Sequence, residues 1–182
     1  MSIDARTLRQ TVGRFVTGVT VIAIDVEGEI RAMTANSFTS LSLDPPLVLF
    51  CLGKDTNAGH QIHSALGFTV SILRHNQRDL SSYFAGAWKE AVPPSFSFTA
   101  WEGGPRLDGC VAALGCQMHA IHDGGDHWIV QGQVVALHQG MEPHLPLLFY
   151  GGRYRQLDAT VHPAPARGDL RLADELIAAY YE

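Results

Sequence analysis

The stretch "MTANSFTSLSLDPPLVLFCL", residues 33–52, places a run of small polar side chains directly before a continuous apolar segment. The apolar part, "PLVLFCL", follows a break at Asp44 and Pro45 and is rich in Val, Leu and Phe. Runs of this kind form strands that are buried on both faces. The stretch therefore predicts a core strand, and it raises the question of why a polar run lies beside that strand.

Helix and strand signals extend from this stretch toward the N-terminus. Two β-rich segments, 19–24 and 30–36, flank the turn "DVEGE" and predict a hairpin. Before them, possible N-caps, an apolar stripe with helical spacing and a terminating glycine predict an amphipathic helix. These helix signals are Ser2, Asp4, Leu8, Val12, Phe15, Val16 and Gly18.

The segments after residue 52 predict short helices and then a series of strands. Helices are expected at 57–65 and 76–86, and strands at 67–73, 95–101, 109–121, 127–137 and 145–150. Many strands, few helices and no alternating βαβ units favour an antiparallel barrel with a few peripheral helices. We expect one domain over residues 1–160, followed by a linker and a short C-terminal helix over residues 161–182.

Composition and charge exclude several classes of function. The 182 residues hold 13 Lys plus Arg against 18 Asp plus Glu, and this net charge of −5 argues against a nucleic-acid binder. No apolar run approaches the roughly 20 residues of a membrane span, and "MSIDARTLRQ" lacks a signal peptide's hydrophobic segment. Three cysteines without a C-x-x-C pair indicate reduced, buried thiols. We therefore expect a cytoplasmic protein that binds neither nucleic acid nor membrane.

The common catalytic and metal-binding motifs are not found in the sequence. "GRFVTG", residues 13–18, has phosphate-loop spacing but lacks the following Lys-Ser/Thr, and no G-x-G-x-x-G occurs. His119 and His122 are expected on opposite faces of one strand. His60 and His63 lack an acidic or thiol partner nearby, so no metal site is predicted. Without a nucleophile elbow or paired carboxylates, a cofactor is expected to supply the chemistry.

The polar run suits the edge of a planar cofactor. Carbonyls and ring nitrogens along such an edge need backbone N–H groups and small side chains, and "TANS", residues 34–37, provides both. Phe38 could pack beside the ring. The alternative is a polar strand end and turn without a ligand.

A second candidate is "GKDTNAGHQI", residues 53–62, which follows the apolar strand. Lys54, Thr56 and Asn57 lie at a predicted helix start, where backbone N–H groups and a cation would bind an anion. The alternative is that Lys54 is an ordinary solvated lysine.

Six groups of residues follow one another along the chain: "GRFVTGVTVIA", "MTANSFTSLSLDPPLVLFCL", "FTVSIL" with "LSSYFAG", "GGPRLDGCVAAL", "GGDHWIVQGQV" and "PLLFYGGRYRQL". Together, over about residues 6–157, they resemble the short-chain flavin reductases that serve two-component flavin-dependent monooxygenases. The resemblance implies a split β-barrel of the Greek-key, FMN-binding type. It also implies a homodimer, with FAD or FMN held in a groove near the dimer interface.

The resemblance further implies which residues form the site. Those expected along the isoalloxazine ring are Thr34, Ala35, Asn36, Ser37 and Phe38, with Ser40 nearby. Those expected at the ribityl and phosphate part are Cys51, Gly53, Lys54, Thr56 and Asn57. Phe84 and Ala85 match a pair near the flavin, and Arg153 and Tyr154 match a C-terminal "GRY" element. His127 matches a catalytic histidine near the nicotinamide, with a merely turn-closing histidine as the alternative.

The implied reaction is reduction of FAD or FMN by NADH or NADPH, with delivery of the reduced flavin to a separate oxygenase. The protein would hold the nicotinamide and flavin rings about 3 to 3.5 Å apart for hydride transfer. Backbone N–H groups around residues 35–37 would stabilise negative charge on the reduced ring. A non-enzymatic flavin-binding or sensing protein with tightly held flavin is the main rival, and a haem-binding relative is more remote. The choice of flavin and of pyridine nucleotide stays open.

Overall fold

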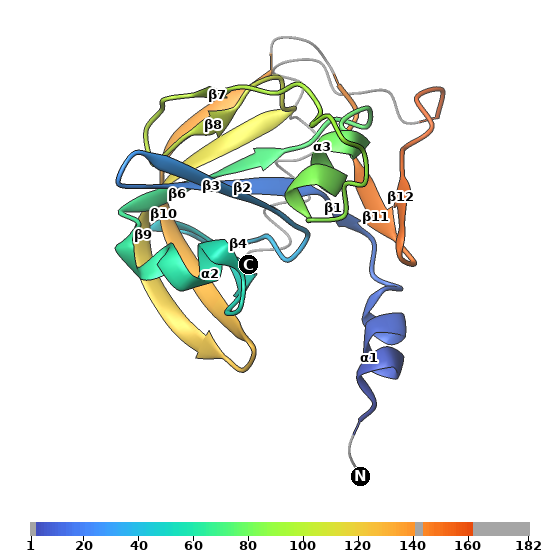
Figure 1. The fold of residues 1–182 in the computed structure, drawn as a ribbon, viewed down its shortest axis with the longest axis horizontal. Helices are drawn as coiled ribbons and strands as arrows, with labels where there is room; N and C mark the ends of the chain where they lie inside the picture. The colour runs from blue at the N-terminus through green and yellow to red at the C-terminus, as the bar shows by residue number, and fades with distance from the viewer. Residues whose placement is uncertain (1–2, 141–143, 162–182) are drawn as a thin grey trace.

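The structure is a computed structural model that describes residues 3–140 and 144–161. Within these residues the chain is mainly β, with antiparallel strands and a few helices outside them (Figure 1), which confirms the predicted fold class. Apart from residue 161, the predicted linker and C-terminal helix over 161–182 lie outside the described residues.

Seven strands form the main sheet, and every neighbouring pair is antiparallel. In spatial order they are β3 (Glu29–Ala35), β2 (Thr20–Val26), β6 (Gly67–Ile72), β9 (Ala112–Gly124), β10 (His127–Gln139), β5 (Pro46–Gly53) and β4 (Thr39–Leu43). The hairpin predicted before residue 36 is β2–β3, and the break at Asp44 and Pro45 is the turn between β4 and β5. β4 is not among the predicted strands, although its alternation of Ser and Leu is a strand signal.

The sheet curls until the segment after β3 reaches β5, near the other end of the strand order. Ser37 makes the connection. Its side-chain oxygen accepts a hydrogen bond from the Cys51 N–H at 3.0 Å, and its hydroxyl donates to the Cys51 carbonyl at 3.1 Å. No strand ladder joins β3 to β5 in the part of the chain that the structure describes. The sheet is therefore an open barrel, and one side chain bridges the gap.

Residues 46–52 are predicted to be buried on both faces, and the structure corrects this prediction. Val48, Phe50 and Leu52 are buried, and the Phe50 ring meets that of Phe68 edge-on at 5.0 Å in the main core. The alternate residues 47, 49 and 51 are only half-buried. Only the inner face of β5 packs against the core. The outer face is partly covered within one chain, so the side chains on it stay half-buried.

Two smaller sheets complete the β structure. β1 (Thr17–Gly18) pairs with β11 (Leu148–Tyr150), which pairs with β12 (Arg153–Arg155). β7 (Phe98–Thr99) pairs with β8 (Arg106–Leu107). The strand predicted at 95–101 is therefore reduced to two residues, and β12 is not predicted.

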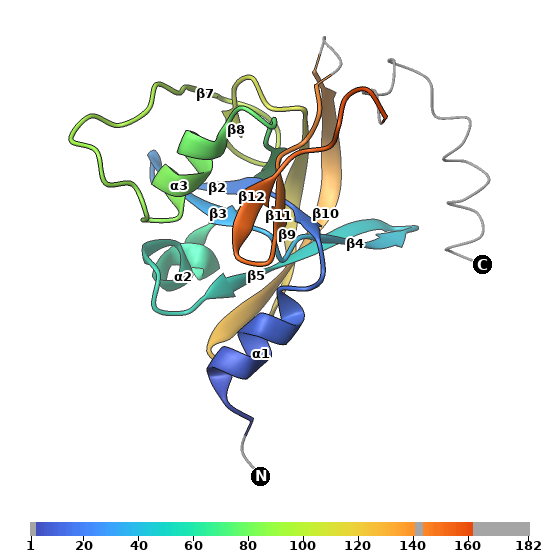
Figure 2. The same ribbon diagram turned by 90° about the vertical axis from the view of Figure 1, so that its right-hand side faces the viewer.

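The helices are shorter than the sequence predicts. α1 (Ala5–Val12) begins after Asp4, whose carboxylate accepts from the Thr7 N–H at 2.9 Å, so this predicted N-cap is confirmed. α1 ends at Val12 with Gly13 as its C-cap, before the predicted end at Gly18. The helix predicted at 57–65 divides into α2 (Asn57–Gln61) and the 3-10 helix η1 (Ile62–Ser64), and α3 spans Arg78–Phe84. Figures 1 and 2 show α1 projecting from the barrel, and none of its residues is buried.

The three cysteines are free thiols, and they differ in burial. Cys110 and Cys116 are buried, and burial raises the pKa of Cys116 to about 12. Cys51 is half-buried, which corrects the expectation that all three are buried. Its backbone, rather than its thiol, makes the bridge to Ser37.

Candidate functional site

A recess of about 730 Å³ lies between β3, the start of α2 and the end of α3, and we call it the β3 recess. It brings together four of the predicted site residues from two separate elements. Its lining comprises Ile30, Arg31, Ala32, Met33, Thr56, Asn57, Ala58, Tyr83, Phe84, Ala85, Gly86, Phe96 and Phe98. A hollow of this size is in the range of small-molecule sites.

A second hollow of about 1060 Å³ lies between α1 and the barrel, and we call it the α1 groove. Asn36, Ser37 and Phe38 line it together with apolar side chains of the N-terminal segment. Residues 30–33 therefore border the β3 recess and residues 36–39 border the α1 groove. The polar run predicted to hold a planar ring lies at the junction between the two hollows.

Thr34 and Ala35, between the two hollows, are tied into the fold by hydrogen bonds. The Thr34 hydroxyl donates to the Ser81 carbonyl in α3 at 2.7 Å. The Ala35 carbonyl accepts from the Thr20 hydroxyl at 2.8 Å. The Thr34 contact fixes α3 against β3, and with it Phe84 and Ala85 at the end of that helix.

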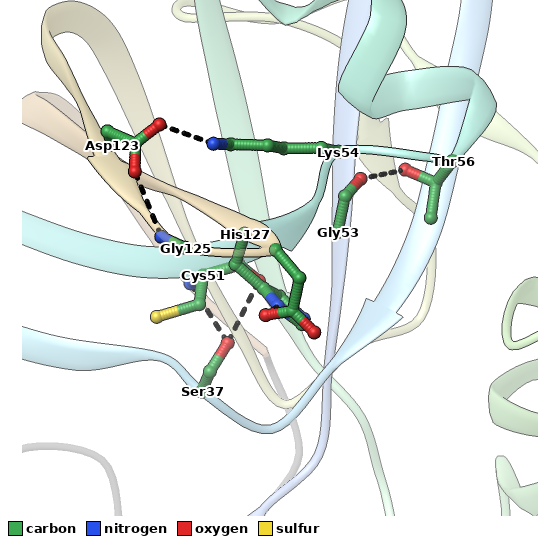
Figure 3. A network of polar contacts seen from close by, with 9 residues as sticks. Ser37, Cys51, Gly53, Lys54, Thr56, Asp123, Gly125 and His127 are labelled. Carbon is green, nitrogen blue, oxygen red and sulfur yellow. Dashed lines mark hydrogen bonds and ion pairs between the residues drawn. The ribbon is translucent and has the colours of Figure 1, made fainter.

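Lys54, at the end of β5, turns toward the tip of the β9–β10 hairpin. Its ammonium forms an ion pair with Asp123 and lies 4.4 Å from the centre of the Trp128 ring. The hydrogen bond from Lys54 lowers the pKa of the Asp123 carboxyl. Figure 3 shows the Lys54 side chain extending toward Asp123 and away from Thr56, so in this structure the ammonium lies at the hairpin tip.

Thr56 is occupied by capping α2. Its side-chain oxygen accepts from the Gly59 N–H at 3.0 Å, and its hydroxyl donates to the Gly53 carbonyl at 2.8 Å. Gly59 is packed so tightly that a Cβ there would lie 2.2 Å from the Gly53 carbonyl oxygen. α2 has only five residues, so its dipole is small. An anion at this helix start would therefore need side-chain cations in addition to the backbone N–H groups.

His127 is the first residue of β10 and lies beside the end of β5. Its Nδ1 is 2.7 Å from the Asp126 carboxylate, and this hydrogen bond lowers the pKa of Asp126. Its Nε2 lies beside Gly53, where a Cβ would be 3.8 Å away. The side chain is 47% exposed, so the ring is held from one side and open to a ligand on the other.

The remaining predicted residues lie outside both hollows. Tyr154 is half-buried in the second core cluster, and its hydroxyl is 2.9 Å from the Ser81 hydroxyl, which joins β12 to α3. Arg153 is exposed on β12, and Ser40 is exposed on the edge strand β4. In this structure Tyr154 therefore has a packing role.

Several residues at these hollows are missing from the predicted set. Arg31, Tyr83, Phe96 and Phe98 line the β3 recess, and Asp123 and Trp128 hold Lys54. The only signal in the sequence is the high density of aromatic residues in "YF" and "FSF", which buried core residues produce equally well.

The described part of the chain has neither a metal-ligand cluster nor a helix that could span a membrane. Among residues 3–140 and 144–161, no group of three or more His, Cys, Asp or Glu side chains could hold a metal ion. His63, one of the histidines considered for a metal, packs its ring against Trp128 at 4.8 Å. Within the same residues, no helix is long and apolar enough to cross a membrane.

The two hollows suit a large planar ligand with a polar tail. Aromatic and small apolar side chains line most of the β3 recess, and Arg31, Thr56 and Asn57 supply polar groups at its edge. Hollows lined mainly by apolar and aromatic side chains with a few polar groups are typical of small-molecule and cofactor sites. The residues present fit a flavin.

Comparison with known proteins specifies the family. The family model of the flavin reductase like domain matches residues 12–158. The reductase subunit HsaB of a flavin-dependent monooxygenase from Rhodococcus jostii is 38% identical over 175 residues, 93% of this chain and 87% of that protein. An NADH-dependent FAD reductase from Streptomyces globisporus is 39% identical over 158 residues, 84% of this chain and 86% of that protein. The solved structure of the flavin reductase PheA2 superimposes with a TM-score of 0.80 at 35% identity, covering 86% of this chain and 99% of that one.

The chain belongs to the flavin reductase-like family. This confirms the resemblance inferred from the sequence, and the enzymatic interpretation is favoured over a non-enzymatic flavin-binding protein.

Proposed function

We propose that this protein uses NADH to reduce a flavin and releases the reduced flavin to a separate oxygenase component. The observation that carries the proposal is the convergence of Thr56, Asn57, Phe84 and Ala85 on one recess, next to the polar run after β3. The proposal is supported by the relatives, which include a monooxygenase reductase subunit and an NADH-dependent FAD reductase.

Bound flavin supplies the hydride acceptor, and the chain positions the reactants. The segment after β3 holds the edge of the ring, with residues 36–38 facing the α1 groove. Lys54, which pairs with Asp123 on the hairpin, and Arg31, which lines the recess, are the cations available to the flavin phosphates. His127, half-exposed at the start of β10, orients the nicotinamide. The chain promotes the reaction by orienting the nicotinamide ring against the flavin ring, and this requires no nucleophilic side chain.

The test of the proposed function is NADH oxidation with FAD, FMN and riboflavin added in turn. We expect flavin-dependent oxidation of NADH by the protein alone. The absence of NADH oxidation with all three flavins would contradict the proposal.

Lys54 is expected to release its ion-pair partner Asp123, which is exposed, and to bind the phosphate that FMN and FAD share. Lys54→Met should raise the Kd of FMN about tenfold and leave the Kd of riboflavin unchanged, because charge-assisted hydrogen bonds contribute about 1.5–3 kcal/mol and riboflavin has no phosphate. Fluorescence titration of each flavin measures both constants.

The matched control is Lys89→Met, since Lys89 is exposed and lines neither hollow. Equal losses of FMN and riboflavin affinity in Lys54→Met would show that Lys54 supports the fold of the site and does not bind phosphate.

The proposed function includes a homodimer that covers the apolar surface around α1. Leu8, Val12, Phe15 and Val16 are 52%, 62%, 75% and 51% exposed. The α1 groove continues this surface onto Phe38 and Phe149. Contiguous apolar surface of this extent is typical of interfaces, and a second copy would bring the residues of the α1 groove to a shared site.

Light scattering is expected to give twice the chain mass of 19.8 kDa at working concentration. The double substitution Val12→Asp with Phe15→Ser should produce a monomer with weakened flavin binding, because both apolar side chains would be lost from the interface. Leu66→Ser is the control, since Leu66 is 91% exposed and lies outside both hollows. A wild-type monomer with full flavin affinity would contradict the dimer.

A cytoplasmic location is part of the proposal. All three cysteines are free, and unpaired thiols are typical of a reducing compartment.

A further inference from the structure

The β3 recess has an aromatic wall that the reduction of a flavin ring does not itself require. The Phe96 ring lies 4.9 Å from that of Phe84 and 5.5 Å from that of Tyr83, and Phe98 extends the cluster at 5.8 Å from Phe96. Phe96 is 38% exposed even though it is a large apolar side chain. An exposed ring backed by other rings presents a flat π-face, on which a nucleic acid base can stack.

Arg31 is the one cation among the residues that line the recess in the described chain. Its Nε donates to the Gln61 side-chain oxygen in α2 at 3.1 Å, and its Nη2 pairs with Glu29. Glu29 is 66% exposed, so the ion pair is weak and exchangeable. The two contacts orient the guanidinium at the recess and leave Nη1 for a phosphate, which arginine binds through its planar fork of donors.

The recess is also continuous with the flavin site of the proposed function. Thr56 and Asn57, expected at the flavin phosphate, form one edge, and Phe84 and Ala85, expected near the ring, form another. The same recess also contains Phe96 and Arg31, so a ligand longer than FMN that occupies it can contact both. FMN ends at its phosphate, whereas FAD continues with a second phosphate, a ribose and an adenine.

We propose that the β3 recess holds the adenosine monophosphate half of FAD, with adenine stacked on Phe96 and its phosphate at Arg31, and that this selects FAD over FMN. The inference rests on the proposed function. NADH carries the same adenosine monophosphate half. The recess is assigned to FAD because it is continuous with the residues expected at the flavin.

Titrations of FAD and FMN with the full-length protein test this assignment. Phe96→Ala should raise the Kd of FAD about tenfold and leave the Kd of FMN within about twofold, because stacking of a base on an aromatic ring is lost. Phe96→Leu should give a similar loss, since it keeps apolar volume without the π-face. Arg31→Gln should also weaken the binding of FAD more than the binding of FMN. The controls are Val92→Ala, in the same segment as Phe96, and Arg155→Gln, because both residues are exposed and outside the recess.

Other outcomes separate the rival occupants. Equal losses of FAD and FMN affinity, or unchanged FAD affinity in Phe96→Ala, would overturn the assignment. A raised KM for NADH, with FMN as acceptor and FAD affinity unchanged, would place the adenosine of NADH in the recess instead. Wild-type protein that reduces FMN but binds FAD no more tightly would refute the inference and preserve the proposed function. Failure to oxidise NADH with any flavin would contradict the proposed function, and the FAD titration would still test the recess.

Discussion

His127→Ala is expected to lower the rate of flavin reduction by NADH about 100-fold and to change the Kd of oxidised flavin by less than about threefold. His127 is fixed through Nδ1 to Asp126 and lies beside Gly53 at the end of β5, with 47% of its side chain exposed. A ring held in this way can orient the nicotinamide without contacting most of the flavin. A misplacement of about 1 Å in the reacting pair reduces a rate about 100-fold.

Single-turnover reduction in a stopped-flow instrument measures the rate, and flavin titration measures the affinity. His119→Ala is the matched control, because His119 is an exposed histidine of the same hairpin that lines neither hollow. An unchanged reduction rate in His127→Ala would leave His127 with the turn-closing role that the sequence also allows.

Protein freed of flavin is expected to oxidise NADH only when flavin is added, with a KM between about 1 μM and 1 mM. Thr56, Asn57 and Ala85 in the β3 recess are exposed, and the α1 groove is bordered by exposed apolar side chains. A ligand held by such open hollows exchanges with solution. Without a partner oxygenase, the electrons from NADH should pass to oxygen and form peroxide.

NADH consumption against flavin concentration, with oxygen uptake and peroxide formation measured in parallel, tests this expectation. One equivalent of flavin that stays bound through every turnover, with activity independent of added flavin, would refute the diffusible-flavin mechanism. That result would favour a flavoprotein with a permanently bound cofactor.

The fold class follows from the sequence because it depends on local pattern. The alternation and β-rich composition of 19–24, 67–73 and 127–137 specify strands, and the Asp4 cap specifies the start of a helix. The predicted boundaries of the helices and strands are less accurate. Helix α1 ends at Val12 rather than at Gly18, since Gly13 closes it and the apolar stripe continues past the helix.

The sequence predicts candidate site residues where they lie close together in the chain, as in the polar run after β3 and in "GKDTNAGHQI". Their surroundings were not predicted. Lys54 pairs with Asp123, 69 positions away, because the register of β5 with β10, and of β10 with β9, brings the hairpin tip to the end of β5.

The sequence by itself therefore determined the strand and helix content, the antiparallel barrel class and the polar segment beside the core strand, because each of these is encoded within a few neighbouring residues. Only the tertiary structure decided that Ser37 bridges the open barrel and that Lys54 turns to Asp123. It also decided that Arg31 and Phe96 border one recess, since such contacts depend on how the sheet curls and how α3 packs against β3. No local pattern specifies these long-range arrangements, because side chains far apart in the sequence meet only after the strands have paired.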